Sequence, residues 1–339
     1  MNKYVELPLL APLYSTYHYQ GIETAIIANN PTIRNYYLNE AIRLRCSRKF
    51  LNGYTSPEIT VEKTSWYASP YLEKLSVPTR FTAGHTNSII RQMLDEGYYV
   101  AFNGVDDYYV QGKSFYKERH FLHDGLICGY NQENKTFCIY AYDQNWILQK
   151  FWTPQVSFNA GCRAMQKQGV YCTIYALKVK PDQISFSPQT VCSKIKGYLY
   201  SSMENYPLDG EGNVYGLVVH EYIAEYVTKL YNGDIPYERM DRRVFRLIWE
   251  HKKAMLERII LIEQSLNMDN SISEKYKPLV MEAEAMRMLY ASHKIKRRDA
   301  VLPVIRNKLL SIMENEKVLL TMLTKKMDEE FKHESMEVP

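Results

Sequence analysis

The pattern of apolar residues changes near residue 207, and this change limits the architectures open to the chain. Before it, short helical and strand-like runs alternate; after it, apolar residues recur at three- and four-residue spacing, as in amphipathic helices. The segment 207–212 between them has the composition of a loop. We therefore predict two domains, residues 1–205 and 206–339, the second being a helical bundle with helices over 214–230, 241–266, 273–292 and 300–332.

The first domain carries helical spacing before it carries strand-like alternation. Helices are predicted over 21–29, 32–46 and 87–96. Helices followed by an antiparallel sheet favour an α+β fold over a doubly wound parallel sheet. The predicted strands are 98–102, 107–110, the two arms of a hairpin within 123–143, 146–152 and 169–179.

The hairpin within 123–143 brings two residues of chemical interest together. A polar, turn-prone segment centred near Glu133 separates two runs rich in β-branched and aromatic residues. Residues equally distant from Glu133 should lie opposite each other, which pairs His123 with Asp143 and Cys128 with Cys138. A histidine oriented by a carboxylate supplies the base and the orienter of a three-residue site, in which the third residue is a nucleophile. The alternative is that His123 and Asp143 form an ordinary cross-strand pair.

Composition and spacing exclude several classes of protein. The net charge of +4 is too small to imply a nucleic-acid partner. The six cysteines show no CxxC pair and no zinc spacing, so we expect free thiols and no metal. The sequence has no signal-peptide-like start and no apolar run of spanning length, which predicts a cytoplasmic protein with no membrane segment.

Three stretches of the sequence carry a resemblance to the butirosin biosynthesis protein H family, and this resemblance covers most of the chain. They are Gln20-Gly21-Ile22-Glu23-Thr24-Ala25, the His123-Asp124-Gly125 that opens the hairpin, and the run from Phe245 to Leu256. The resemblance implies a papain-like fold, related in shape to bacteriocin-processing cysteine peptidases. It also implies amide-bond formation from acyl groups that a carrier protein holds on its phosphopantetheine arm, with no other cofactor.

The resemblance implies a catalytic cysteine at the position of Gly21, with His123 as base and Asp143 as its orienter. Glycine has no side chain, so acyl-enzyme chemistry at this position is impossible as the sequence stands. Either the nucleophile has been replaced, or the protein naturally lacks it, or the family's cysteine aligns with a position a few residues away from Gly21. Gln20 is a candidate oxyanion donor or simply an exposed residue before a helix. We interpret His18 as a polar surface residue and Cys46 as a packing residue rather than a nucleophile.

The resemblance implies acyl transfer from an acyl or peptidyl carrier protein to a small amine, in specialised-metabolite or non-ribosomal peptide biosynthesis. Because carrier proteins are typically acidic, the basic run 294–298 and the pair Arg242-Arg243 are candidate docking surfaces. Two alternatives stay open: a non-catalytic protein that binds its ligand in the papain-like cleft, and a hydrolase, either a peptidase or a thioesterase. The long final helices pack within the chain or across a homodimer.

Overall fold

The computed structural model describes residues 2–27, 30–52, 55–67, 69–82, 84–166, 169–200 and 212–336. By its internal contacts the chain divides into two units, Met1–Arg34 with Thr64–Gln183, and Asn35–Lys63 with Ile184–Pro339. The predicted domain boundary at 205/206 and the predicted loop 207–211 lie outside the described residues. The two units are not separated at a single point of the sequence. Residues 35–63 and 184–199, which precede the predicted boundary, belong to the helical unit.

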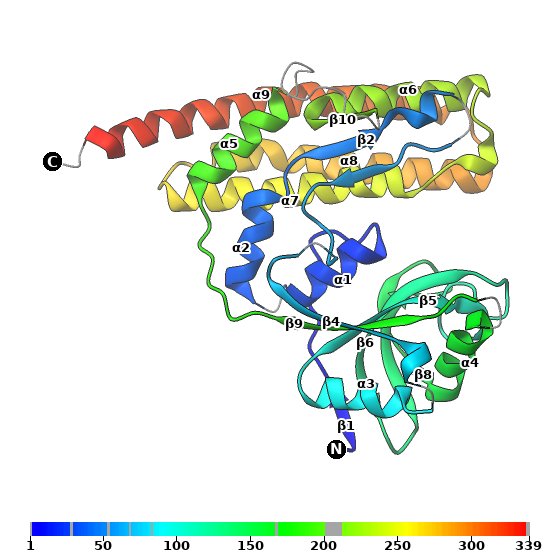
Figure 1. Cartoon of the computed structure of the whole chain (residues 1–339). Coiled ribbons are helices and arrows are strands. Elements are labelled where there is room, and N and C mark those ends of the chain that lie inside the picture. The colour runs from blue at the N-terminus through cyan, green and yellow to red at the C-terminus, as the bar shows by residue number, and fades with distance from the viewer. Residues whose placement is uncertain are drawn as a thin grey trace. The chain divides into compact units, whose positions relative to one another are not determined.

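The first unit contains an antiparallel sheet with the strand order β4-β9-β5-β6-β7-β8, in which β1 also pairs with β6 (Figure 1). Hydrogen bonding between neighbours is antiparallel throughout this sheet, as predicted for an α+β fold. Its strands are β1 (Tyr4–Glu6), β4 (Leu72–Pro78), β5 (Tyr99–Asp106), β6 (Leu122–Asn131), β7 (Thr136–Tyr142), β8 (Leu148–Pro154) and β9 (Thr173–Val179).

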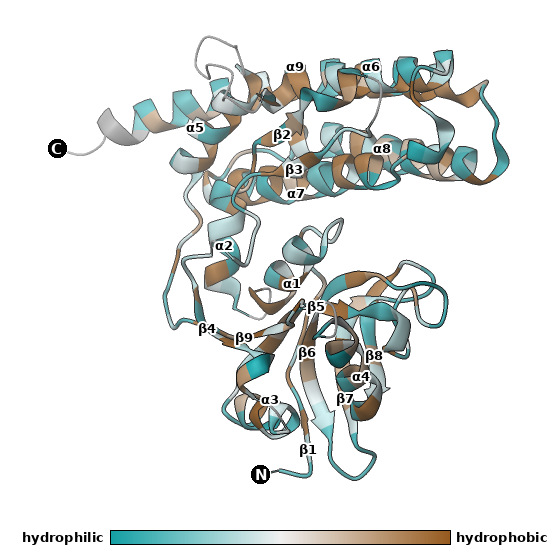
Figure 2. Cartoon of the chain, turned by 45° about the vertical axis from the view of Figure 1, so that its right-hand side comes forward, coloured by the Kyte–Doolittle hydropathy of each residue, from teal (hydrophilic) through white to brown (hydrophobic). Residues whose placement is uncertain are grey.

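Three helices accompany the sheet: α1 (His18–Ile27), α3 (Thr86–Asp95) and α4 (Gln155–Gln166). The helices α3 and α4 contribute residues such as Ile90 and Phe158 to the same buried cluster as the central strands. Figure 2 shows the apolar character of β5 and β6 at the centre of this unit. The sheet face beneath α3 and α4 is therefore the core of the first unit.

The second unit is mainly helical. Its long antiparallel helices α6, α7, α8 and α9 extend along one another, and α5 packs on α9 (Figure 1). A small sheet with the order β10-β2-β3 also belongs to it. The elements are α5 (Pro188–Leu199), α6 (Val219–Asn232), α7 (Arg243–Ser265), α8 (Ser271–Lys296), α9 (Val301–Met336), β2 (Leu44–Ser47), β3 (Ile59–Val61) and β10 (Asn213–Tyr215), while α2 (Pro31–Glu40) contains the division between the units.

The helix predicted over 32–46 is wrong in its second half. The helix α2 ends at Glu40, and Leu44–Ser47 forms the strand β2, which pairs with β10 and β3. The buried Arg258 of α7 donates hydrogen bonds to the carbonyl oxygens of Tyr37, Leu38 and Ala41, and so satisfies the acceptors at the end of α2. Long-range partners therefore end this helix, and no local sequence signal does. The predicted end of the first helix at Asn29 lies outside the described residues.

The strand predicted over 107–110 is also wrong. Residues Asp107–Tyr109 form a single 3₁₀ turn, because the Asp106 side chain accepts a hydrogen bond from the Tyr108 backbone N–H and caps the turn. This turn follows the end of β5 and places Asp107 beside the start of β6. The same turn opens the loop that runs to β6.

Candidate active site

His123 is oriented by Asp107 and not by Asp143. Its Nδ1 atom lies 2.9 Å from Asp107 Oδ2, and the Asp107 side chain is completely buried. The carboxylate of Asp143 instead accepts hydrogen bonds from the backbone of Asn145 and Ile147. The predicted His123–Asp143 pair is therefore wrong, although the expected combination of an imidazole and a carboxylate is present.

A bulge in β5 explains how Asp107 reaches His123. The register between β5 and β6 shifts between Phe102 and Val105, so that Val105 lies opposite His123. Gly104 sits inside this bulge with a φ of +70°, a conformation that favours glycine. The extra residue brings the following 3₁₀ turn next to the start of β6, which sets Asp107 against the imidazole.

The register of the hairpin explains why Asp143 does not lie opposite His123. Ile127 pairs with Ile139 and Leu126 with Tyr140, which is the predicted alignment around Glu133. The pairing of β6 with β7 stops there, since β7 ends at Tyr142 and the chain turns toward β8. The predicted pairing of Cys128 with Cys138 is wrong by one residue, because the register shifts between Ile127 and Gly129 and Cys138 pairs with Gly129. The two cysteines are still in contact, with their sulfur atoms 3.5 Å apart as free thiols.

Lys113 completes a buried charged cluster with Asp107. Its Nζ atom lies 2.6 Å from Asp107 Oδ1 and donates to the Asp124 carbonyl oxygen at 2.8 Å, and both charged side chains are fully buried. Burial alone would raise the pKa of the Asp107 carboxyl, but the Lys113 ammonium and the His123 hydrogen bond outweigh this and lower it. Asp107 is therefore ionised, and it accepts a further hydrogen bond from Ser114.

His123 itself is neutral near pH 7. Burial lowers its pKa below the ordinary value of 6.5, the Asp107 hydrogen bond opposes this, and the Lys113 charge adds to it. Because Asp107 accepts a proton from Nδ1, the lone pair of the neutral ring is on Nε2. Among the described residues, none forms a hydrogen bond with that Nε2 atom. This is the protonation state that a general base requires.

His18, the first residue of α1, lies against His123. Their ring centroids are 4.2 Å apart, and His18 Nε2 accepts the backbone N–H of Tyr142 at 3.1 Å. Only 6% of His18 is exposed, so our interpretation of it as a surface residue is wrong. Burial, with the charges of His123 and Lys113, holds its pKa well below the ordinary range. The start of α1 and the His123 imidazole are therefore in direct contact.

Gly21 lies one turn further along α1, and a side chain there would have to displace the end of the Leu148 side chain. A Cβ atom built on Gly21 would overlap Cδ2 of Leu148, from the start of β8. Gln20 is completely buried, and its amide Nε2 donates to Thr64 Oγ1 at 2.8 Å. This burial counts against Gln20 as an oxyanion donor. A nucleophilic side chain at position 21 would thus require Leu148 to move.

The cysteines offer no substitute nucleophile. All six are buried, and burial raises the pKa of Cys46, in the other unit, to about 12. The described residues contain no cluster of three or more histidine, cysteine or acidic side chains suited to a metal ion. None of the helices in the described part of the chain combines the length and apolar character that a bilayer-spanning segment requires.

A second histidine–aspartate pair adjoins the first. His120 Nδ1 lies 2.7 Å from Asp106 Oδ2, but 65% of the His120 side chain is exposed. Its ring contacts Tyr108, which with Tyr109 and Tyr116 lines a hollow of about 300 Å³. Consecutive aspartates thus hold histidines three residues apart, and only the pair at Asp107 is shielded from solvent.

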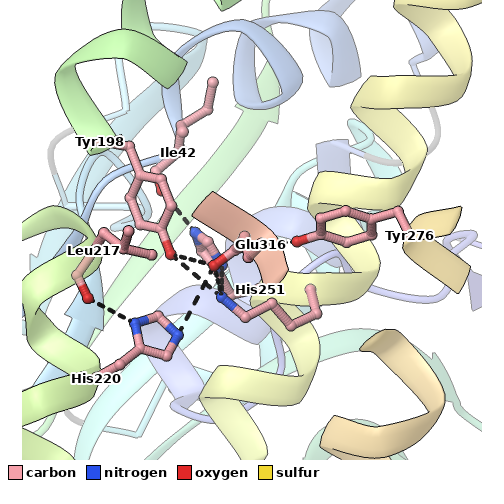
Figure 3. A network of polar contacts seen from close by, with 8 residues as sticks. Ile42, Tyr198, Leu217, His220, His251, Tyr276 and Glu316 are labelled. Carbon is pink, nitrogen blue, oxygen red and sulfur yellow. Dashed lines mark hydrogen bonds and ion pairs between the residues drawn. The ribbon is translucent and has the colours of Figure 1, made fainter. Parts of the chain in front are cut away.

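The second unit contains a separate polar cluster around the buried Glu316 (Figure 3). Glu316 Oε2 lies 2.5 Å from Lys252 Nζ and accepts the Tyr198 hydroxyl at 2.7 Å, while Oε1 accepts the Tyr276 hydroxyl. Burial would raise the pKa of Glu316, but Lys252 and the nearby imidazoles lower it to about 2. The groups come from α5, α7, α8 and α9, so this cluster ties the helices together.

Two histidines border the Glu316 cluster. His251 donates from Nε2 to the Ile42 carbonyl oxygen at 2.8 Å, and His220 Nε2 lies 4.0 Å from Glu316 Oε2 (Figure 3). Burial lowers the pKa of His220 to about 3 and that of His251 well below its ordinary range. With both imidazoles neutral, Lys252 and Glu316 balance each other, and we regard the cluster as structural.

Several basic side chains of the predicted docking surfaces form hydrogen bonds or ion pairs within the chain. Lys294 donates to the Met240 carbonyl oxygen, Arg297 lies 3.2 Å from Glu238, and Arg243 lies 2.6 Å from Asp241. Docking of an acidic carrier on these residues stays a prediction. The chain matches no protein-family model and no curated protein in the comparisons.

Proposed function

We propose that the first unit is a papain-like acyltransferase domain that forms an amide bond by direct transfer, without an acyl-enzyme. The donor is an acyl thioester on the phosphopantetheine arm of a carrier protein, and the acceptor is a small amine. One observation carries the proposal: a neutral His123, fixed by the ionised Asp107, lies at the start of α1 while Gly21 offers no nucleophile. The donor and acceptor classes come from the family resemblance.

The chemistry needs a base and no covalent intermediate. The amine nitrogen attacks the thioester carbonyl carbon, and His123 Nε2 takes a proton from that nitrogen. The C–N bond forms, the C–S bond breaks, and the imidazolium returns its proton to the departing sulfur, so the products are an amide and a thiol. Asp107 holds the ring tautomer and stabilises the imidazolium during the step.

Burial of the pair favours transfer to an amine over transfer to water. Only 19% of the His123 side chain is exposed, and Asp107 and Lys113 are fully buried. A site that excludes bulk water protects a thioester from hydrolysis while a bound amine reacts. A hydrolase would use the same base on a water molecule, and its product would be the free acid.

The proposal is tested by incubating the protein with octanoyl-pantetheine and a panel of primary amines, with amide and free acid measured by mass spectrometry. We expect amide formation that falls at least about 100-fold in His123→Ala, with no octanoyl adduct on the intact protein at any time. Amide formed equally fast by the His123→Ala variant would contradict the proposal, as would an octanoyl adduct on the wild-type chain. Free acid as the main product would identify a hydrolase.

A second candidate function is binding of the acyl thioester without chemistry. Leu148 favours it, because its side chain fills the space beside Gly21 that a reacting group would occupy in a papain-like site. Binding of octanoyl-pantetheine to a chain that yields neither amide nor acid would support this function over transfer.

A further inference from the structure

Trp146 is an exposed aromatic residue held in an unfavourable backbone conformation. Its φ is +61°, in the left-handed region that bulky residues rarely adopt, and 45% of the residue is exposed. Packing contacts can offset the free-energy cost of such a conformation at a buried residue. An exposed tryptophan makes fewer of these contacts, so less of the cost is offset. Strained backbone conformations cluster at active sites and ligand-binding positions.

Asp143 builds the turn that imposes this conformation. Its Oδ1 atom accepts the backbone N–H groups of Asn145 at 2.9 Å and Ile147 at 2.8 Å, and Oδ2 accepts the Gln149 side chain at 2.6 Å. The Asp143 carbonyl oxygen also accepts the Trp146 N–H at 2.9 Å. The predicted orienter of His123 is therefore the residue that fixes the position of Trp146.

A chain of ring contacts connects Trp146 to the base. Its ring centroid lies 5.1 Å from that of Phe115, Phe115 lies 4.9 Å from Phe121, and Phe121 lies 5.2 Å from His123. Phe115 is buried, whereas Phe121 is 41% exposed. The guanidinium of Arg119 covers the Phe115 ring at 3.8 Å. Trp146 and Phe121 are thus the two exposed rings of a row that ends at the imidazole, with the buried Phe115 between them and the Arg119 guanidinium also 5.2 Å from the Phe121 ring centroid. We call these two exposed rings the aromatic surface of the site.

We infer, on the basis of the acyl transfer proposed above, that this surface of Trp146 and Phe121 receives the apolar acyl group of the thioester, and that Asp143 is its positioning residue. An acyl chain that lies on these rings has its carbonyl end beside His123. Aromatic faces accept chains of different length, so the surface sets a preference for apolar acyl groups over short or charged ones. The occupant is an acyl chain on a pantetheine thiol.

The structure offers a matched pair of tryptophans for the test. Trp152 lies on β8 of the same unit, is 40% exposed, and contacts Tyr4 rather than the rings near His123. Trp146→Gly removes the ring and also relieves the left-handed strain, so it should fold with a melting temperature within a few degrees of the wild type. Trp146→Phe keeps an aromatic face at the same position. Trp152→Ala removes an equally exposed tryptophan away from the site.

The experiment measures the affinity of each variant for acetyl-pantetheine and octanoyl-pantetheine by calorimetry. We expect the octanoyl thioester to bind the wild type and Trp152→Ala at least about tenfold more tightly than the acetyl thioester. Trp146→Gly should lose most of this difference, and Trp146→Phe should keep most of it. An unchanged tenfold difference in Trp146→Gly would overturn the assignment and leave the proposed function standing. A wild type that binds neither thioester would overturn both.

Asp143→Ala provides a second measurement. Without the side-chain acceptor the turn loses its hydrogen bonds to Asn145 and Ile147, and Trp146 should leave its place. We expect this variant to match Trp146→Gly in its loss of preference for the longer acyl chain and to show changed tryptophan fluorescence. A variant with changed fluorescence and the full tenfold preference would also overturn the assignment.

Discussion

His123 Nδ1 lies 2.9 Å from Asp107 Oδ2, and this contact joins the start of β6 to the turn that ends β5. It fixes the tautomer of the imidazole and leaves Nε2 as the acceptor. The Lys113 ammonium keeps Asp107 ionised inside the protein. The base of the proposed reaction is thus built from three residues within seventeen positions of one another, 107 to 123, rather than across the hairpin.

A cysteine introduced at position 21 should react with an acyl thioester only if the Leu148 side chain moves aside or is shortened. We expect Gly21→Cys/Leu148→Ala to form an octanoyl adduct with octanoyl-pantetheine about tenfold faster than Gly21→Cys alone, because Leu148 occupies the space of the new side chain. Intact-protein mass spectrometry measures the adduct. Adding His123→Ala should abolish it, and an adduct that forms equally fast without His123 would show that position 21 is out of reach of the base.

The pH dependence of transfer should follow the protonation of His123. Since burial lowers its pKa below 6.5, the neutral base persists at pH 6.5, and kcat/KM should fall only at more acidic pH. The Lys113 charge contributes to this lowering, so Lys113→Met should raise the pKa of His123 and move the fall to higher pH. Initial rates of amide formation across the pH range measure both. A wild-type midpoint above 6.5 would contradict the neutral-base account.

The Lys252–Glu316 pair should stabilise the helical unit only as a pair. Glu316→Gln leaves the Lys252 ammonium buried without its counterion, so we expect a loss of about 3–5 kcal/mol in the free energy of unfolding. Lys252→Met should cost a similar amount, and the double variant should cost less than the sum. Urea unfolding followed by circular dichroism measures these values. Strictly additive losses would mean that the two charges do not interact.

Acid should destabilise the helical unit through His220 and Glu316. His220 has a folded pKa of about 3, so as pH falls below 6.5 the unfolded state binds a proton that the folded state does not. This lowers the free energy of unfolding by up to about 1.4 kcal/mol per pH unit. Glu316, with its folded pKa of about 2, adds a loss of the same sign as pH falls through 4.5.

The comparison of His220→Gln with the wild type isolates the histidine. Between pH 6.5 and 5 the variant should show a smaller slope of unfolding free energy against pH, because it lacks the imidazole that the unfolded state protonates. Urea titrations at several pH values give both slopes. Equal slopes would assign the acid sensitivity to other groups.

The sequence predicts the elements whose patterns are local and long. The helix predicted over 241–266 is observed as Arg243–Ser265, and the helix over 273–292 is contained in α8, because apolar periodicity persists over many turns. The hairpin and its register at Leu126 and Ile127 were likewise predictable from turn chemistry, but the one-residue shift between Ile127 and Gly129 was not. The short strands β2 and β3 were missed. The strand β2 pairs with β3 and, through a long-range contact, with β10.

The candidate site depends on structural features that the spacing of residues along the sequence does not reveal. His123 follows from its strand position, but its partner follows from a one-residue bulge at Gly104 and from the turn after Asp106. Two consecutive aspartates with histidines three residues apart were a signal for paired contacts, and the sequence did not show which pair is buried. The overlap of Leu148 with position 21 is a tertiary contact with no sequence signature.

The most direct measurement compares Asp107→Asn with Asp143→Asn in amide formation from octanoyl-pantetheine. Asp107→Asn should lower kcat/KM by at least about 100-fold, because the asparagine can neither fix the tautomer nor stabilise the imidazolium. Asp143→Asn keeps the acceptor for the two turn N–H groups and should stay within about threefold of the wild type. A large loss in Asp143→Asn together with an active Asp107→Asn would contradict the account.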